Sequence, residues 1–560
     1  MCIRDSYHVA PISANWRVKK ICCRPFTGEL TISASAIPRN SYDFAKRYIL
    51  KIDRIVCHRR HPSGLPNSYG IRPTQYLVVW REVKSDPATT PLSWHPVEEL
   101  ASILELLQRY VSDTKAAKRQ RLEIKSSPTI AGYKRKYLHD DLHSHLPTPQ
   151  SRSATSREQS IVSSSDSDSK HSFAAPDTPA IYNGVFQRRQ GVVVAVPRSG
   201  PEIEAVDSTL MPMKHMVEDS FAIDMIDAEL AIRQRYLSIL QRLPGPPVTL
   251  VNDLDHETPS LGFKFISEYV LGEGVERMDQ DTIVGCDKCK PNMGASRGCE
   301  YTQMCACLEY AEPDESAMTE EQLARWQKAK YSQDLEEEVA TFPKKFPYFS
   351  TGPRVGCLVE HYLNHRYMIY ECNDNCSCGP NCKNRNVQHG RKVKLEIFKT
   401  PNRGFGLRCP QSLRKGQFID TYLGEILTDE EAIQREDNNN DPSKASYLFS
   451  LDKFAYHPDG SIDVKQKDMY TVDGQFMGCP TRFINHCCDP NVRMYTVSYA
   501  KYDRRIYDLA FFAVEAIEAG TELTFDYMDV EETDEKSRNV DASKVSCHCG
   551  AENCRGFLWN

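Results

Sequence analysis

Short apolar runs alternate with polar turn signals through most of the second half of the chain. Between residues 392 and 530, runs such as VKLEIFKT, GQFIDTYLGEIL, SYLFSLD, DLAFFAVEAI and TELTFDY are rich in β-branched and aromatic residues. Gly, Asn and Asp separate these runs, as expected of turns. The pattern is typical of short strands, so we expect this region to be mostly β and built from small sheets.

The first half of the chain is more varied. Residues 46–110 contain two strand-like runs, KRYILKIDRIV and TQYLVVW, and a run of helical spacing, VEELASILELLQRYV. We expect a small β-rich unit that ends in a helix. Residues 111–214 are basic and then serine-rich, with too little apolar surface for a packed core, and we interpret them as a disordered linker. Residues 215–245 have a helical period that PGPP ends.

Composition narrows the possible function classes. A chain of 560 residues predicts several folded units, and a net charge of -6 argues against a polycation that coats nucleic acid. The basic runs KAAKRQR and YKRK in the linker are either nuclear import or nucleic-acid signals, or simply solvated charge. No run of 18 apolar residues and no secretory signal pattern is present, so we expect a soluble intracellular protein with no membrane partner.

Cysteines cluster at short spacings, which in a reducing compartment favours metal thiolates, with zinc as the default metal. The three groups are Cys286, Cys289, Cys299, Cys305 and Cys307; Cys372, Cys376, Cys378 and Cys382; and Cys547, Cys549 and Cys554. The nine thiols of the first two groups overfill two tetrahedral zinc sites, and fill three sites only if three thiols each bridge two metals. Two separate four-cysteine sites with a spare thiol are the alternative.

A three-zinc cluster with nine thiolates would be negatively charged and would favour nearby cations. Seven basic residues lie close to it in the sequence: Lys288, Lys290, Arg297, Lys383, Arg385, Arg391 and Lys392. The third cysteine group is one ligand short. The loop RFINHCCDPN offers two candidates for the missing ligand, Cys487 and Cys488. Cys357 lies outside these patterns, and we interpret it as a buried thiol.

Five motifs carry a resemblance to a known family: NRGFGL (402–407), YLGEIL (422–427), SYLF (446–449), RFINHCCDPN (482–491) and ELTFDY (522–527). With the cysteine blocks, they make region 245–560 resemble the SET-domain lysine methyltransferases of the Su(var)3-9 class. The resemblance implies a pre-SET zinc domain at 246–390, a SET domain of small sheets with a pseudoknot at 391–530, and a post-SET segment at 543–560. It also implies three zinc ions in the pre-SET cluster and one more bound by Cys488 with the last three cysteines.

The activity implied by this resemblance is methyl transfer from S-adenosylmethionine to lysine 9 of histone H3, in heterochromatin in the nucleus. By resemblance Tyr527 and Tyr447 line the channel for the lysine amine, and Phe525 leaves room for di- and trimethylation. The implied cofactor residues are Gly404, Phe405, Gly406, Tyr447, Arg482, Asn485, His486, Tyr527, Leu558 and Trp559. The expected partners are the histone H3 tail and the nucleosome.

The first folded unit resembles a chromodomain through Tyr48, the YLVVW strand and SWHPVEEL. That resemblance implies a methyl-lysine cage formed by Tyr48 and Trp80, with Val83 where a third aromatic residue is usual, and Trp94 in the core. A chromatin reader with an inactive SET domain is the alternative function. Such a protein would be expected to lose Tyr527, Tyr447 or Asn485, and all three are present. A zinc-dependent nucleic-acid-binding protein would not explain the tyrosines.

Overall fold

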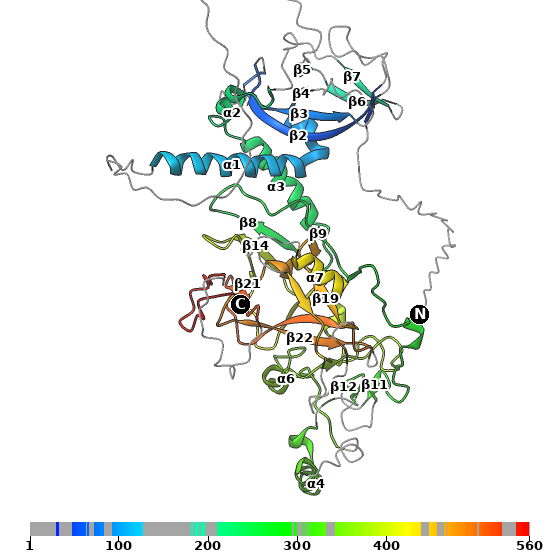
Figure 1. Cartoon of the computed structure of the whole chain (residues 1–560). Coiled ribbons are helices and arrows are strands. Elements are labelled where there is room, and N and C mark those ends of the chain that lie inside the picture. Colours follow the sequence, from blue (N-terminus) through cyan, green and yellow to red (C-terminus); the bar gives the residue numbers. More distant parts are fainter. Residues whose placement is uncertain are drawn as a thin grey trace, which may run out of the picture. The chain divides into compact units, whose positions relative to one another are not determined.

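The structure of the chain is a computed structural model (Figure 1). It describes residues 30–32, 48–62, 64–66, 72–82, 92–126, 181–182, 185–189, 192–196, 210–293, 296–299, 306–308, 311, 313–331, 342–437, 447–455, 464–465, 468–500, 503–528 and 545–558. The chain divides into two compact units: residues 1–102 with 112–224, and residues 103–111 with 225–560. Each unit is described by itself.

The N-terminal unit is built around one sheet of order β5-β4-β3-β2-β1-β7-β6. Its strands are β1 (Leu30–Ile32), β2 (Tyr48–Arg60), β3 (Thr74–Glu82), β4 (Leu92–Pro96), β5 (Ile181–Tyr182), β6 (Val185–Arg189) and β7 (Val192–Val196). A core of Cys57, Leu77, Val79, Leu92 and Trp94 forms between the central strands. The buried ring of Trp94 confirms its expected core position.

A helix follows this sheet, as the sequence predicts, but it is longer than expected. Helix α1 (Leu104–Ser126) continues past residue 110, and β5, β6 and β7 form inside the expected linker. Helix α1 runs through the expected boundary at residue 111, and apolar runs such as VVVAV pair as strands within the stretch expected to be a linker. The serine-rich segment 151–180 lies outside the described residues.

The expected helix at 215–245 is two helices, α2 (Lys214–Ser220) and α3 (Ile226–Leu240). The Ser220 hydroxyl donates to the Val217 carbonyl at 2.7 Å and so competes with the backbone hydrogen bonds of a continuing helix. The Asp227 carboxylate accepts from the Ala228 N–H at 3.0 Å in the first turn of α3. The boundary between the two units also falls between these helices, at Asp224 and Met225.

The C-terminal unit contains several small sheets and few helices, which confirms the expected mostly β architecture. One sheet has the order β21-β24-β15-β14-β8, a second β13-β22-β23-β16 and a third β10-β17-β19-β18, and β20-β9 and β11-β12 are pairs. The strands of these sheets up to residue 408 are β8 (Val248–Val251), β9 (Lys264–Phe265), β10 (Val270–Leu271), β11 (Asn292–Met293), β12 (Ser296–Arg297), β13 (Ile369–Tyr370), β14 (Leu395–Lys399) and β15 (Phe405–Arg408). The others are β16 (Phe418–Tyr422), β17 (Glu425–Thr428), β18 (Leu448–Ser450), β19 (Tyr470–Asp473), β20 (Met477–Gly478), β21 (Asn485–His486), β22 (Val492–Ser498), β23 (Asp508–Ala513) and β24 (Glu522–Phe525).

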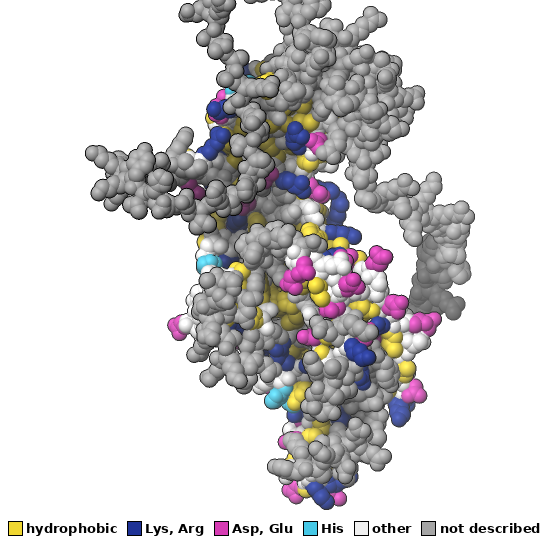
Figure 2. Space-filling model, in the orientation of Figure 1, with side chains coloured by type: hydrophobic (Ala, Val, Ile, Leu, Met, Phe, Trp, Pro, Cys, Tyr) yellow, Lys and Arg dark blue, Asp and Glu magenta, His cyan; other side chains and the backbone are white. Residues whose placement is uncertain are grey.

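Three further helices belong to this unit: α4 (Glu320–Tyr331), α6 (Glu360–His365) and α7 (Asp429–Asp437). Helix α4 lies between the first two cysteine groups, in a charged segment of the chain. In the described part of the chain, no helix has the length and apolar character needed to span a membrane. On the face shown in Figure 2, the basic and acidic side chains of the described residues are interspersed.

The core of the second sheet fixes the position of the site residues that follow. Phe512 of β23 is fully buried, and its ring centroid lies 5.4 Å from Phe418, 5.6 Å from Tyr495 and 6.4 Å from Tyr348. The preceding residue of the strand, Phe511, is equally buried, and its side chain lies on the opposite face of the sheet. Strand β23 is therefore covered on both faces, which explains its unbroken apolar sequence.

We predict that Phe512→Ala lowers the free energy of unfolding of the C-terminal unit by about 3–5 kcal/mol, because it leaves a cavity among three aromatic rings. The measurement is urea unfolding followed by circular dichroism. Phe476→Ala is the matched control, since Phe476 is 59% exposed. The control should change the stability by no more than about 0.5 kcal/mol. Equal effects of the two substitutions would contradict this account of the core.

Candidate active site

The loop 482–491 is held against the segment 522–527 by paired backbone. Strand β21 runs parallel to β24, with Asn485 opposite Thr524 and His486 opposite Phe525. The Cys487 N–H donates to the Phe525 carbonyl at 3.0 Å. The Tyr527 hydroxyl donates to the Ile484 carbonyl at 3.0 Å. Two motifs that are far apart in the sequence are thus brought into one place, as the resemblance implies.

Aromatic rings gather around this pairing. The ring of Phe525 lies 4.8 Å from Tyr527, 4.9 Å from Phe511 and 5.8 Å from Phe449. Burial raises the pKa of Tyr527 well above its ordinary value, and the nearby Tyr447 raises it further. The Tyr527 hydroxyl therefore keeps its proton at neutral pH and can orient a neighbouring group by hydrogen bonding.

Tyr447 lies near Tyr527 and is held through its backbone. Its carbonyl accepts from the Tyr422 hydroxyl at 3.0 Å and from the Gly474 N–H at 3.0 Å. The guanidinium of Arg482 lies 4.3 Å from the centroid of the Tyr447 ring. The Nε atom of Arg482 is buried without a hydrogen-bond partner in the described part of the chain, so it remains a donor for a bound molecule.

The cofactor residues of the first motif adjoin Asn485. A Cβ on Gly406 would lie 2.8 Å from Glu522 Oε1, 3.0 Å from Phe398 Cε1 and 3.1 Å from Asn485 Nδ2, so only glycine fits. Gly404 has a φ of +70°, which also favours glycine. The intervening Phe405 begins β15, and its carbonyl accepts from Asn485 Nδ2 at 3.4 Å. The two glycines thus let backbone and amide approach each other closely.

Two residues inside the quoted motifs had no role assigned from the sequence, Arg403 and Glu522. The carboxylate of Glu522 accepts from Asn485 Nδ2 at 2.8 Å and from Arg403 Nη2 at 2.5 Å. This fixes the amide of Asn485 with its nitrogen toward Glu522, so its Oδ1 is left as an acceptor. Glu522 opens the motif ELTFDY, and no pattern in a single sequence distinguishes a positioning carboxylate from a solvated one.

His486 is a neutral imidazole in this site. Its Nδ1 accepts from the Tyr527 N–H at 3.2 Å, and its Nε2 lies 3.3 Å from the sulfur of Cys488. Burial lowers the pKa of His486 to about 4, and the charge of Arg555 lowers it further, against the opposing effect of Asp526. The ring thus links the aromatic cluster to the thiols, and its expected contact with the cofactor stays a prediction.

Four thiols meet beside this loop. The sulfurs of Cys488, Cys547, Cys549 and Cys554 all lie within 4.8 Å of one another. Four thiols at this spacing are a donor set that suits tetrahedral zinc. Cys487 precedes Cys488 in the sequence and forms no disulfide, but it is not one of these four thiols. The structure therefore places the expected fourth ligand, Cys488, next to the three cysteines of the tail.

An ion pair fastens the C-terminal tail to the same segment that carries the tyrosine. The guanidinium of Arg555 binds the Asp526 carboxylate through two hydrogen bonds, of 2.5 and 2.7 Å. The Leu558 N–H donates to the Val545 carbonyl at 2.8 Å, which folds the tail on itself. Trp559, the other expected apolar residue of the tail, lies outside the described residues. The tail is thus joined to the site by thiols and by a bidentate pair.

The remaining cysteines form three overlapping groups that could hold metal ions. They are Cys289, Cys299, Cys307 and Cys378; Cys299, Cys372, Cys378 and Cys382; and Cys307, Cys372 and Cys376. Four of these thiols belong to more than one group, which two separate sites with a spare thiol would not produce. Cys286 is buried beside them but belongs to no group, and Cys305 lies outside the described residues, so the ligand roles of these two stay predictions.

The basic residues expected near the cysteines divide between different tasks. Nearby thiolates of Cys378 and Cys372 help to raise the pKa of Arg385, which also donates to Asp374 at 2.9 Å. Arg391 does not serve the cluster, because it pairs with Asp420 at 3.2 Å. The buried side chain of Cys357 confirms the interpretation of that thiol.

In the N-terminal unit, the expected cage residue Trp80 is buried. Its indole N–H donates to the Ser93 hydroxyl at 2.7 Å, and its ring lies edge-on to His95 at 6.1 Å. This geometry is that of a core residue. The side chain of Tyr48 is not described, and Val83 lies outside the described residues. The methyl-lysine cage therefore stays a prediction.

Comparison with protein families gives two matches in the C-terminal unit. The model of the SET domain matches residues 404–528, and the model of the Pre-SET motif matches residues 241–385. These matches agree with the expected order of a cysteine-rich domain followed by a SET domain. Residues 46–110 lie outside both, so the chromodomain stays a prediction.

Curated relatives cover the same region. The histone-lysine N-methyltransferase, H3 lysine-9 specific KMT1, of Fusarium mangiferae is 42% identical over 317 residues, 56% of this chain and 88% of the relative. The H3 lysine-9 specific dim-5 of Neurospora crassa is 39% identical over 318 residues, with the same shares. A solved structure of DIM-5 gives a TM-score of 0.40 at 36% identity and covers 53% of this chain and 100% of that chain. Su(var)3-9 of Drosophila pseudoobscura pseudoobscura is 32% identical over 367 residues, 65% of this chain and 50% of the relative.

We predict that Gly406→Ala weakens the binding of S-adenosylmethionine about tenfold or more, because the added Cβ displaces Asn485 and Glu522. Isothermal titration calorimetry measures the affinity. Gly520→Ala is the control, since Gly520 has a φ of +82° and nothing within 4 Å of an added Cβ. It should lower stability by about 1 kcal/mol and leave the affinity unchanged. Unchanged affinity in Gly406→Ala would remove Asn485 from the binding site.

Proposed function

This chain belongs to the H3 lysine-9 specific histone-lysine N-methyltransferases, and from that membership we propose that it adds up to three methyl groups to lysine 9 of histone H3. One observation carries the proposal for its own residues. The pairing of β21 with β24 places Asn485, His486, Phe525 and Tyr527 around one site. A reader with an inactive SET domain would be expected to lose Tyr527, Tyr447 or Asn485, and the chain has all three.

S-adenosylmethionine would supply the methyl group, carried on a sulfonium. Asn485 fits its amino-acid part, because Glu522 accepts from Nδ2 and leaves Oδ1 as an acceptor. Arg482 offers an unused buried N–H at the same site. Gly406 lets Asn485 and Glu522 lie against the backbone of this motif, where any side chain would collide with them. These features support a cofactor site built from the residues expected for it.

The lysine amine must be uncharged and aligned with the methyl group for an in-line displacement. Phe525, Phe449 and Phe511 provide apolar walls, which disfavour the charged form of the amine. The protonated hydroxyl of Tyr527 orients the amine from its fixed position against the Ile484 carbonyl. Tyr447 closes the other side under Arg482. The protein therefore contributes position and a low local polarity.

Phe525 has no hydroxyl, so nothing at that ring holds a water that would crowd a methylated amine. This supports di- and trimethylation. The substrate places the chain on chromatin in the nucleus, with the H3 tail and the nucleosome as partners. Silencing within heterochromatin follows from that modification. Reading of a methylated tail by the N-terminal unit remains part of the proposal, although Trp80 is buried.

Zinc would be held at two places. One ion fits the four thiols that include Cys488. Three ions fit the shared thiols of the pre-SET groups, because bridging by common cysteines is what their overlap supports. Bound metal would set the tail against the loop that carries Asn485 and His486.

We predict that Tyr527→Phe lowers methylation of an H3 tail peptide by about 100-fold or more, because the amine loses the hydroxyl that aligns it. Mass spectrometry of the peptide with each lysine replaced in turn measures the rate and the site. Tyr495→Phe is the control, since Tyr495 is a buried tyrosine that also donates to a backbone carbonyl at 3.0 Å. The control should stay active. Equal rates in both variants would contradict the role of Tyr527.

A second variant tests product specificity. Phe525→Tyr should shift the products from tri- and dimethyl-lysine toward monomethyl-lysine, because the new hydroxyl holds a water in the space of the added methyl groups. The product distribution at equal turnover shows the shift. The proposal of di- and trimethylation would be rejected if Phe525→Tyr gave the same products as the wild type. It would also be rejected if the wild-type enzyme added one methyl group only.

Zinc content gives an independent test. The purified chain should hold about four zinc ions by mass spectrometry of the metals, and Cys488→Ser should hold about one fewer. Cys487→Ser is the matched control, because Cys487 adjoins the thiol group without belonging to it. The control should keep the full content. Loss of zinc in Cys487→Ser, or none in Cys488→Ser, would show that the assignment of the two neighbours is reversed.

A further inference from the structure

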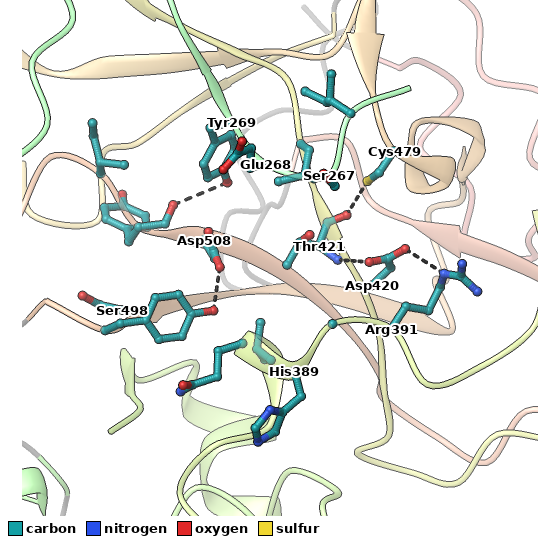
Figure 3. A pocket seen from close by; sticks show the side chains of 18 of the residues that line it. Ser267, Glu268, Tyr269, His389, Arg391, Asp420, Thr421, Cys479, Ser498 and Asp508 are labelled. Carbon is teal, nitrogen blue, oxygen red and sulfur yellow. Dashed lines mark hydrogen bonds and ion pairs between the residues drawn. The ribbon is translucent and has the colours of Figure 1, made fainter. Parts of the chain in front are cut away.

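The C-terminal unit contains a cavity of about 480 Å³. Its lining includes none of the residues of the proposed methyl-transfer site. Figure 3 shows that Asp508 and the pair of Asp420 and Arg391 face this cavity from different elements. Asp508 is the first residue of β23, and Asp420 belongs to β16. Two half-buried carboxyls thus share one cavity, and they differ in their partners.

Asp420 is paired with a cation, although burial still raises its pKa to about 6. Its carboxylate lies 3.2 Å from Arg391 Nε and accepts from the Thr421 N–H at 3.0 Å. The guanidinium of Arg391 also donates to the carbonyls of Val393 and Pro244, at 2.6 and 3.0 Å. Arg391 is therefore committed to Asp420 and to backbone. Within this cavity, a buried carboxylate is stabilised by a guanidinium.

Asp508 lacks such a partner. Its Oδ2 accepts from the Tyr499 hydroxyl at 2.6 Å. Among the described residues no basic side chain forms an ion pair with it, although Arg277 also lines the cavity and acts on its carboxyl from a greater distance. Burial raises the pKa of Asp508 to about 6, against the lowering effect of the Tyr499 hydrogen bond. At neutral pH the carboxylate is mostly charged and has one hydrogen bond.

The walls around Asp508 are phenolic. Tyr269, Tyr499 and Tyr507 all line the cavity. The hydroxyl of Tyr269 lies 3.5 Å from the Tyr507 carbonyl and accepts from the Leu509 N–H at 3.3 Å, so it is occupied by backbone. An uncompensated carboxylate among aromatic rings is the chemistry that favours an organic cation, which gains an ion pair and contact with ring surfaces.

We propose that this cavity binds a single alkyl cation, an alkylguanidinium or alkylammonium group, through the carboxylate of Asp508. The bound cation would pair with Asp508 as Arg391 pairs with Asp420. It could come from a free small cation or from an arginine or lysine side chain of a peptide, and the chemistry recognised is the same. The site is separate from methyl transfer and does not depend on it.

The test is isothermal titration calorimetry at pH 7.5 on the full zinc-loaded chain. The probes are n-butylguanidine, n-butylamine and the neutral n-pentanol, with the peptide Gly-Gly-Arg-Gly-Gly and its citrulline counterpart. We expect at least one cationic probe to bind at least tenfold more tightly than its neutral counterpart. Tighter binding of the small probes assigns the cavity to a free cation, and tighter binding of the arginine peptide assigns it to a side chain.

Variants connect the binding to Asp508. Asp508→Asn should lower the affinity at least tenfold, whereas Asp253→Asn, at an exposed aspartate of the same unit, should leave it unchanged. Asp508→Asn should melt at or above the wild-type temperature, because a neutral amide replaces a buried charge that has no cation. This melting temperature shows that the variant is folded.

A further variant separates an external cation from an internal one. Arg277→Gln removes a positive charge from the lining and should tighten binding of the cationic probes. If Arg277 were the natural partner of Asp508, this variant would instead melt at a lower temperature and bind no better. That result would overturn the proposal, as would the absence of cation binding to the wild-type chain or equal binding to Asp508→Asn.

Discussion

The parallel contact of β21 with β24 is the constraint on which the proposed site depends. Each strand is two to four residues long, too short to be stable by its own hydrogen bonds. Side-chain hydrogen bonds stabilise the contact between the two strands further. Asn491 accepts from the Thr524 N–H at 2.9 Å and donates to the Glu522 carbonyl at 2.8 Å, and the hydroxyl of Tyr527 reaches back to Ile484. The same segment thus presents Phe525 and Tyr527 on a support fixed at both ends.

Two carboxylates of this segment also connect it to other parts of the site. Glu522 holds Asn485 and is itself held by Arg403, while Asp526 holds Arg555 of the tail. Each carboxylate flanks the aromatic residues of ELTFDY and connects them to another segment. Substituting one such residue leaves a partly buried partner without its ion pair. Positioning in this protein therefore resides in residues that touch no substrate.

Much of this organisation could be predicted from the sequence, and the exceptions have physical causes. The strands of residues 392–530 follow from apolar runs and turns. The three tail cysteines indicate a missing fourth ligand, and the resemblance selects Cys488 over Cys487 for that place, where the structure has it. The break between α2 and α3 could not be predicted, because a local hydrogen bond of Ser220 overrides a helical period. The partner of Arg391 is also invisible in sequence, since Asp420 lies on a distant strand. Likewise, the burial of Trp80 depends on tertiary packing.

The thiol group explains how a tail so far along the chain can complete the site. Cys488 and Cys547 are 59 residues apart, and closing a loop of that length costs about 4 kcal/mol in chain entropy. A bidentate pair such as Arg555 with Asp526 contributes only about 1–3 kcal/mol, so it cannot hold the tail alone. Structural zinc in small peptides contributes about 10–16 kcal/mol, enough to offset that entropy. Zinc held by Cys488 and the three tail cysteines would therefore stabilise the docked tail, and the ion pair of Arg555 with Asp526 would fix its orientation.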